Sequence, residues 1–534
     1  MRFFEIRRAV PLLALLTVLV AVQPALAEGN LHKLKHIIVI MQENHSFDNY
    51  FGALAYAPGT PYHTPNITGG CPTNDHSCVD GLTCGVDLSG NFTCSNSNLD
   101  DDGSTVFAFH DSRRCVIPDL DHGWPSTHHE ANFNFPNDTL FQSLSDGFVL
   151  VNDATEQHDN GVENATDDQT MAFYNQNEIP FYYDLAQKFA INDRYFSSVL
   201  GPTFPNRSYL LAATSFGHLT TSDSFPPPGS GGYKPITGTI FDLMDQNSVT
   251  WADYFFQHGA LIDVPQGGSF RPFPGDPHFQ PLGLFLAQAA GAPNVSPLPQ
   301  VSFIDPDFGV LGGLAAENDE HPPTDIQRGQ AFVSQVINAV RNGPYWKDSI
   351  IFLTYDEHGG FYDHVAPPRA SQGHAPNPDG INPGQCEDLS YPPASLQPGG
   401  GAECNSNVLT GTLDTSVKNA IALCPQLAAD PTGPFPAACA NFDQYGFRVP
   451  FVAISAFSKP HYVSHTVGDH TSILALIEKA FVSLNSGDDG GRPHLTKRDQ
   501  HADALEDMFD FNGAPSLNTT IGVAPPPVTD CTPH

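Results

Sequence analysis

The sequence predicts an α/β fold in which one largely parallel sheet is covered by helices on both faces. Continuous apolar runs rich in β-branched residues indicate buried strands, and KHIIVIM (35–41) is the first of them. Segments of helical periodicity separate these runs, and 325–342 is the clearest. Strands that alternate with helices form parallel pairs, because each crossover helix has to pack on a face of the sheet.

The other elements follow in chain order by the same reasoning. Short apolar runs predict strands, and longer segments with apolar residues on one side predict helices. The expected strands are VTWADYFF (249–256), VSFIDP (301–306), SIIFLTYDE (349–357) and VPFVAISAF (449–457), and the expected helices are YYDLAQKFA (182–190), TIFDLMDQN (239–247), 325–342 and SILALIEKAF (472–481).

The helix at 325–342 has its own start signal. Pro322 and Pro323 end whatever precedes it, and Thr324 with Gln327 has the spacing of a capping box. The residues predicted to form its buried face are Phe332, Val333, Val336, Ile337 and Val340.

The N-terminus has the layout of a cleavable export signal. Residues 1–27 combine early arginines, an apolar stretch shorter than the roughly 20 residues that span a bilayer, and small residues near Ala27. We therefore expect a secreted or periplasmic protein without an integral membrane segment after signal removal. Residues 28–534 are expected to form a single domain with Pro- and Gly-rich insertions at about 56–140 and 366–440.

Ten cysteines agree with export. They fall into two loop-like regions, and no pair has the C-x2-C spacing of a zinc site, so disulfides are the preferred interpretation. The cysteines of the first region are Cys71, Cys78, Cys84, Cys94 and Cys115, and the others are Cys386, Cys404, Cys424, Cys439 and Cys531. The sequence does not decide how they pair.

The formal charge excludes some partners. The net charge of −35 becomes −37 once three arginines and one glutamate leave with the signal. A surface of this sign repels nucleic acid backbones and anionic bilayers, so nucleic acid is not an expected partner.

Oxygen-bearing side chains follow two of the predicted strands directly. Glu43 and Asn44 come after the first strand, and Asp356 and Glu357 come after the strand at 349–357. In an open α/β sheet the ligand crevice lies beyond the carboxyl ends of the strands, so these four side chains would meet there. Crowded carboxylates favour a hard divalent cation between them. The alternative is that Glu43 caps a following helix while the second pair opens a solvated turn.

Further polar motifs supply the groups that phosphoryl transfer needs, namely a nucleophile, cationic groups and a proton donor. Thr203 and Arg207 lie in GPTFPNRSY, and His321 lies in NDEHPP. His122 lies in DLDHGWPSTHHEANF, and His364 lies in DEHGGFYDHV.

Six motifs in one chain order resemble a secreted phosphoesterase family. They are KHIIVIMQENHSFDNYFG, TFPNR, NDEHPP, DEHGGFYDHV, YGFRVPFVAIS and GDHTSILALIE, and with LTKRDQHADALEDMFDF they extend from residue 35 to about 510. The family joins bacterial phosphatidylcholine-hydrolysing phospholipases C, plant non-specific phospholipases C and bacterial acid phosphatases. The resemblance implies the doubly wound α/β/α sandwich of the alkaline-phosphatase superfamily.

The resemblance also implies roles at matching positions. Glu43, Asn44, Asp356 and Glu357 match the residues that hold one divalent metal, which oxygen ligands leave open as Ca, Mg, Mn or Fe. Thr203 matches the nucleophile, a threonine in the plant phospholipases and a serine in the acid phosphatases. The metal would lower the pKa of its hydroxyl, and attack would give a phosphothreonine that water then hydrolyses.

The histidines and one arginine complete the implied site. His321 matches a histidine that contacts the phosphoryl group and protonates the leaving oxygen, and His122 matches another active-site histidine. His258, in WADYFFQHG, matches a third, and His364 would line the site for substrate. Asn44 and Arg207 would stabilise charged oxygens, although Arg207 would equally serve to tie down its own loop.

Three functions remain open on these grounds. The preferred one is a phospholipase C acting on phosphatidylcholine-type lipids, because position 203 is a threonine. The second is a broad-specificity acid phosphatase acting on small phosphate monoesters. The third, from another class, is a secreted binding protein that kept the scaffold without turnover.

Overall fold

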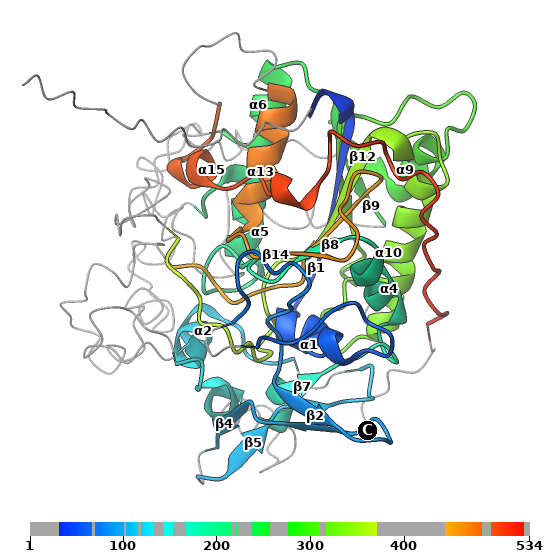
Figure 1. Ribbon diagram of the computed structural model, residues 1–534. Helices are drawn as coiled ribbons and strands as arrows, with labels where there is room; N and C mark the ends of the chain where they lie inside the picture. Colours follow the sequence, from blue (N-terminus) through cyan, green and yellow to red (C-terminus); the bar gives the residue numbers. More distant parts are fainter. Residues whose placement is uncertain are drawn as a thin grey trace, which may run out of the picture.

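The computed structural model places a mixed α/β domain around one central sheet (Figure 1). It describes residues 31–66, 70–100, 103–115, 119–131, 144–152, 167–215, 221, 238–256, 276–309, 317–370, 444–482 and 493–527. The expected signal segment, most of the second insertion and its cysteines, and Cys531 lie outside these ranges.

The central sheet has eight strands in the order β10-β9-β11-β1-β12-β13-β8-β14. All neighbouring pairs are parallel except the two that β13 makes with β12 and β8. The mainly parallel sheet predicted from the sequence is therefore confirmed. The strands are β1 (His36–Gln42), β8 (Ala190–Asn192), β9 (Trp251–Phe255), β10 (Phe279–Pro281), β11 (Val301–Asp305), β12 (Ser349–Tyr355), β13 (Val452–Ser455) and β14 (Tyr462–Ser464).

Helices cover both faces of this sheet, as Figure 1 shows. The first group contains α4 (Pro180–Lys188), α9 (Leu282–Ala289) and α10 (Ile326–Arg341), and α10 packs on the other two. The second group contains α5 (Thr203–Ala212), α6 (Ile240–Gln246), α13 (His470–Ile477) and α15 (Lys497–His501), and α5 and α13 pack together. Because the strands between them face helices on both sides, β1 and β12 are buried along their whole length.

The N-cap of helix α10 lies one residue later than predicted, and the helix begins at Ile326. The residues of its predicted apolar face are all buried, which confirms that face. However, Asp325 rather than Thr324 is the N-cap, and its carboxylate accepts a hydrogen bond from the Gln327 amide. Thr324 is not available for this role because its hydroxyl donates to the His321 carbonyl at 2.6 Å.

The first insertion forms small hairpins below the sheet, at the lower end of the molecule in Figure 1. The described part of 56–140 was expected to be irregular, and it contains β2 (Cys84–Val86) with β3 (Phe92–Cys94) and β4 (Ser97–Leu99) with β5 (Thr105–Phe107). Disulfides join Cys71 to Cys78 and Cys84 to Cys94, as the cysteine pattern predicted. The remaining elements are β6 (Phe109–His110), β7 (Ala172–Phe173), α1 (Phe47–Phe51) and α2 (Trp124–Ala131).

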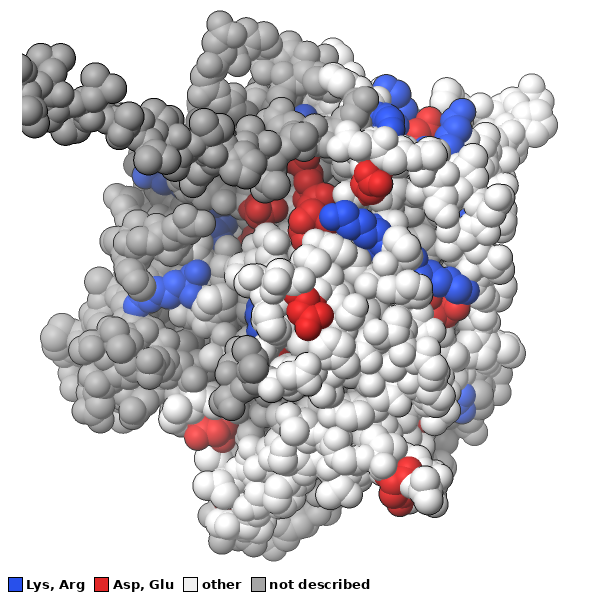
Figure 2. Space-filling view, viewed as in Figure 1, with Lys and Arg blue, Asp and Glu red and all other residues white. Residues whose placement is uncertain are grey.

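The surface of the described residues carries few charges on the face seen in Figure 2. Acidic and basic side chains lie scattered there, and most of that surface is uncharged. Within the described ranges, no helix combines the length and the apolar character that crossing a bilayer requires.

Candidate active site

The two predicted oxygen-rich strand ends lie side by side. Strands β1 and β12 are parallel neighbours, and their register pairs Gln42 with Tyr355 as the last residues. The next residues therefore leave the sheet at the same edge. There, the backbone amide of Asn44 donates a hydrogen bond to Asp356 Oδ1 at 3.2 Å. Sequence positions more than three hundred residues apart thus meet at the carboxyl end of the sheet.

Helix α5 joins this edge through Arg207. Its Nε and Nη2 atoms donate to Glu43 Oε1 at 3.1 and 2.8 Å, and Nε lies 3.5 Å from Asp356 Oδ2. Thr203 is the first residue of the same helix, four positions earlier, so it lies on the face that carries Arg207.

The turn before Thr203 is held by Asn206, a residue whose role the sequence did not indicate. Its Oδ1 accepts from the Val199 amide at 3.0 Å, and its Nδ2 donates to the Gly201 carbonyl at 2.8 Å. Asn206 is fully buried, and Thr203 is 8% exposed. The side chain of Asn206 thus fixes the loop that ends at Thr203.

Four side chains, those of Glu43, Asn44, Asp356 and Glu357, form a group that we call the quartet. The quartet fits a divalent cation. Asn44 Oδ1, Asp356 Oδ2 and Glu357 Oε1 are buried and have no hydrogen-bond partner, although buried oxygens of this kind are nearly always paired. Glu43 and Asp356 share the single guanidinium of Arg207, so its one positive charge does not offset the negative charge of the carboxylates. Oxygen ligands with this charge suit a hard divalent ion.

The carboxyl groups respond to this crowding in opposite directions. Burial and the nearby Glu43 raise the pKa of Asp356 well above its usual value, and Arg207 offsets only part of the effect. Burial also disfavours the charged form of Glu357, but His122 and His358 outweigh it and lower the pKa of that carboxyl. Asp356 is thus the carboxyl that most needs a further cation.

A chain of contacts orients Glu357. Its Oε2 accepts from the Gly359 amide at 2.7 Å and lies 3.5 Å from His358 Nδ1, whose Nε2 lies 2.8 Å from Glu130 Oε2. Gly359 has φ +64°, and a Cβ there would lie 2.2 Å from the Asn44 carbonyl oxygen. Only glycine permits this approach, which brings the turn after β12 against Asn44.

Two of the predicted histidines face the quartet. His122 Nε2 lies 3.7 Å from Glu357 Oε1, and the ring centroids of His122 and His321 are 6.0 Å apart. Burial lowers the pKa of each ring, but Glu357 and Asp119 raise that of His122 to about 9, and Asp119 with Glu43 raises that of His321 to about 9. Both rings are therefore cationic at neutral pH.

Glu320 anchors the loop that carries His321, and the sequence reasoning missed it. Its buried carboxylate accepts hydrogen bonds from three tyrosine hydroxyls, those of Tyr50 and Tyr355 at 2.6 Å each and that of Tyr182. Burial raises the pKa of Glu320 to about 7, against the effect of these donors. Gly329 gives the carboxylate its room, because a Cβ there would lie 2.1 Å from Glu320 Oε1.

His45 supports the same loop as a neutral ring. Its Nε2 lies 3.1 Å from the Glu320 carbonyl oxygen and its ring stacks on Tyr50 with centroids 4.2 Å apart. Burial lowers the pKa of His45 to about 3. Ser46 caps α1 by accepting from the Asn49 amide, so the polar residues after Asn44 build local structure.

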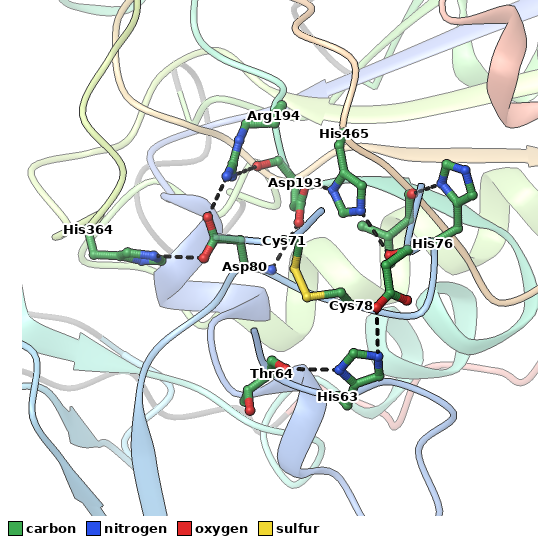
Figure 3. The surroundings of a disulfide bond; sticks show 12 residues. His63, Thr64, Cys71, His76, Cys78, Asp80, Asp193, Arg194, His364 and His465 are labelled. Carbon is green, nitrogen blue, oxygen red and sulfur yellow. Dashed lines mark hydrogen bonds and ion pairs between the residues drawn. A yellow bond between two sulfur atoms is a disulfide. The ribbon is translucent and has the colours of Figure 1, made fainter. Parts of the chain in front are cut away.

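One further predicted site residue within the described ranges, His364, makes its contacts away from the quartet. His364 contacts Asp48 Oδ2 at 2.6 Å and Asp80 Oδ1 at 3.3 Å, beside the Cys71–Cys78 disulfide (Figure 3). Its ring also lies 3.4 Å from Arg448 Nη2, so its partners form an ion-pair cluster of their own. His258 lies outside the described residues.

Comparison with known proteins agrees with the geometry. The profile of the Phosphoesterase family matches residues 34–482. Non-specific phospholipase C6 of Arabidopsis thaliana is 26% identical over 93% of this chain and 76% of its own length, and non-specific phospholipase C1 of the same plant is 26% identical over 90% and 72%. Phospholipase C B of Mycobacterium tuberculosis is 28% identical over 91% and 80%.

The family match covers most of the chain, including every described residue of the quartet and both cationic histidines. The relatives are named for the hydrolysis of phosphoric esters. The chain belongs to the phosphoesterase family and is a hydrolase that acts on phosphoric ester bonds.

Proposed function

We propose that the chain is an exported, metal-dependent phospholipase C that cleaves phosphatidylcholine-type lipids through a phosphothreonine on Thr203. The observation that carries the proposal is the placement of Thr203 one helical turn before Arg207, which itself contacts Glu43 and Asp356. The names of the relatives favour lipid diesters as substrates. The sandwich of helices around the sheet is the one expected of an alkaline-phosphatase-like enzyme.

The metal would be held by the side chains of Glu43, Asn44, Asp356 and Glu357. When bound, a divalent ion at these oxygens supplies a Lewis acid that lowers the pKa of the nearby hydroxyl and offsets charge on the phosphoryl group. Arg207 holds Glu43 and Asp356 in place, so the oxygens converge before any ion arrives.

Thr203 supplies the nucleophile in this proposal. It is the first residue of α5, and no side chain caps that helix end, so the positive end of the helix dipole faces the phosphoryl group. The Thr203 hydroxyl gives its proton to solvent, and its Oγ1 atom forms a bond to phosphorus while the bond from phosphorus to the glycerol oxygen breaks. Asn206 keeps the hydroxyl at this position by fixing the preceding turn.

His321 supplies the proton for the leaving oxygen. Its raised pKa keeps it protonated at neutral pH, and its Nδ1 is bonded to the Pro322 carbonyl oxygen at 2.6 Å, so Nε2–H is the free donor. His122 offers a second cationic donor to the phosphoryl oxygens. After proton transfer, water cleaves the phosphothreonine and returns Thr203 to its hydroxyl form.

The test uses the purified mature protein, with and without a chelator, on phosphatidylcholine vesicles and on p-nitrophenyl phosphate. Release of diacylglycerol that depends on metal supports the proposal, and a phosphorylated Thr203 peptide should be recovered after acid quenching. Thr203→Ala should lose at least about 10³-fold in kcat, whereas Thr203→Ser keeps a hydroxyl and should keep part of the rate.

Two outcomes would replace the proposal. Fast hydrolysis of the monoester alone would identify an acid phosphatase. Binding of metal without any turnover, in the wild-type chain as in Thr203→Ala, would identify a binding protein.

A further inference from the structure

A cluster of potential metal ligands lies beside the quartet and shares no residue with it. One ligand atom from each of Asp119, His122 and His321 lies within 4.8 Å of those of the other two. The three side chains come from the loop before α2 and the loop before α10. In the mechanism above Asp119 contacts neither substrate nor metal and acts only by raising the pKa of the two histidines.

Both imidazoles are already oriented as metal-binding histidines usually are. His122 Nδ1 is bonded to the Leu120 carbonyl oxygen at 2.7 Å, and His321 Nδ1 is bonded to the Pro322 carbonyl oxygen at 2.6 Å. A neutral ring that donates through Nδ1 presents the lone pair of Nε2, and such carbonyl bonds are the common support of ligating histidines. At neutral pH each ring also carries a proton on Nε2, so an ion that binds there has to displace it, and the neutral tautomer that remains is the one that the two carbonyls stabilise.

Carboxylate oxygens face both Nε2 atoms. His321 Nε2 lies 3.8 Å from Asp119 Oδ2, and His122 Nε2 lies 3.7 Å from Glu357 Oε1. Glu357 is fully buried, and this oxygen has no hydrogen-bond partner. This oxygen belongs to Glu357 of the quartet, so it marks a shortage of cations where the two groups of ligands meet and is shared evidence for both sites.

The spacing is close to that of a four-coordinate site. Bonds of about 2.0–2.2 Å in a tetrahedron place ligand atoms about 3.4 Å apart, so the 3.8 Å contact has to shorten by roughly 0.4 Å. The side chain of Asp119 is 44% exposed and is free to make this adjustment. Its exposure also gives an ion a path from solvent.

We propose that Asp119, His122 and His321 form a second metal site, which takes a borderline divalent ion such as Zn²⁺ and inhibits the enzyme. Two imidazole nitrogens and one carboxylate suit Zn²⁺, whereas the all-oxygen quartet suits harder ions, so the two sites select different metals. An ion held by His321 Nε2 and by the His122 ring, whose Nδ1 is the atom 3.8 Å from Asp119 Oδ1, removes the proton donor His321 and the phosphoryl contact of His122. Binding is independent of the proposed function, and the inhibition rests on it.

The test is a Zn²⁺ titration of protein already saturated with Mg²⁺, with bound metals counted after equilibrium dialysis. The wild type should bind one additional Zn²⁺ per chain while Mg²⁺ stays bound, and turnover should fall over the same range of Zn²⁺ concentration. Asp119→Asn and His122→Asn should each bind Zn²⁺ at least tenfold more weakly. His129→Asn, at an exposed histidine of the helix α2 that follows His122, is the matched control and should bind as the wild type does.

Other results would overturn the proposal. If Zn²⁺ only replaces Mg²⁺, so that total metal per chain does not rise, the second site does not exist. If Asp119→Asn binds Zn²⁺ as tightly as the wild type, the ligands are wrong. Thermal unfolding checks that each variant is folded, and a chain that hydrolyses no phosphoric ester would refute the proposed function while the metal count still tests the site.

Discussion

The protein buries two clusters of carboxylates, and they differ in how their negative charge is offset. The first is the metal-site cluster of Glu43, Asp356 and Glu357. The second, which we call the arginine cluster, contains Asp48, Asp80 and Asp363 around the fully buried Arg448. Arg448 Nη2 donates to Asp48 Oδ1 at 3.0 Å, and its Nε donates to Asp363 Oδ1 at 2.9 Å.

Every carboxylate oxygen of the arginine cluster has a partner. His364 bonds to Asp48 and Asp80, and Arg194 pairs with Asp80 beside the disulfide loop (Figure 3). Burial disfavours charge on Asp48 and Asp80, yet these cationic partners outweigh it and hold the pKa of both carboxyls below its usual value. Burial prevails at Asp363 and raises its pKa, as it does at Asp356, so the direction of the pKa shift does not separate the two clusters.

The difference teaches that proximity of acidic groups does not identify a metal site. Asp48, Asp363 and His364 also lie close enough together to hold an ion. The protein's own cations already neutralise them, whereas the metal-site cluster keeps unpaired oxygens. Charge balance, rather than distance, separates the two.

The largest expected effect comes from Asp356→Asn. The variant should lose stoichiometric metal and about 10³-fold or more in kcat/KM, because one anionic ligand is gone. In the presence of a chelator it should be at least as stable as the wild type, since the substitution also removes repulsion from Glu43. Metal analysis, kinetics and urea unfolding check these three points, and a chelated variant much less stable than the wild type would contradict the comparison.

Arg448→Met tests the arginine cluster. Removing the guanidinium that touches both Asp48 and Asp363 leaves buried charges uncompensated, so the free energy of unfolding should fall by about 3–5 kcal/mol. Metal bound per folded chain should not change. A loss of metal without a loss of stability would show that the two clusters are not separate.

Glu320→Gln tests a third way to bury a carboxylate, with hydroxyl donors instead of cations. The amide accepts fewer hydrogen bonds, so tyrosine hydroxyls lose partners and stability should fall by about 1–3 kcal/mol. We also expect kcat to drop about tenfold with metal content unchanged, because the His321 loop loosens. Tyr50→Phe removes one donor and keeps the carboxylate, so its smaller effect serves as the control.

The smallest effect is the pH dependence that His364 contributes. Burial opposes its charge, but Asp48 and Asp80 raise the pKa of His364 to about 9, against the nearby Arg448. A histidine whose pKa is higher in the folded state than in the unfolded state stabilises the fold. The contribution of His364 is complete below its unfolded-state pKa of about 6.5 and disappears as the pH rises through about 9. We discount it to about 2 kcal/mol, since the side chain is 21% exposed.

The measurement compares wild type with His364→Gln by urea unfolding from pH 5.5 to 9.5. The stability difference should be largest at the acidic end and should shrink steadily above pH 6.5. A difference that grows with pH would contradict the assigned sign.

The sequence was sufficient to predict site residues that directly follow a recognisable strand. Glu43 and Asp356 were predictable because each follows an apolar run, and parallel strands end at one edge. Glu320 was not, since its partners Tyr50, Tyr182 and Tyr355 are brought together only by the fold. Arg448 left a signal that was not used, a single cation within the apolar run YGFRVPFV.

Ambiguity between equivalent residues explains the misplaced helix start. Thr324 and Asp325 are both favourable caps, and only the hydrogen bond from Thr324 to His321 decides between them. No local pattern contains that information, because it depends on how the His321 loop folds back.

The metal-site cluster extends from the two innermost strands of the sheet, each hydrogen-bonded on both sides. Backbone amides of such strands exchange with deuterium only through the global opening of a domain. The residues just before Glu43 and Asp356 should therefore be among the last to take up deuterium. Heat should then abolish activity together with the cooperative loss of the whole sheet and not in an earlier, local step.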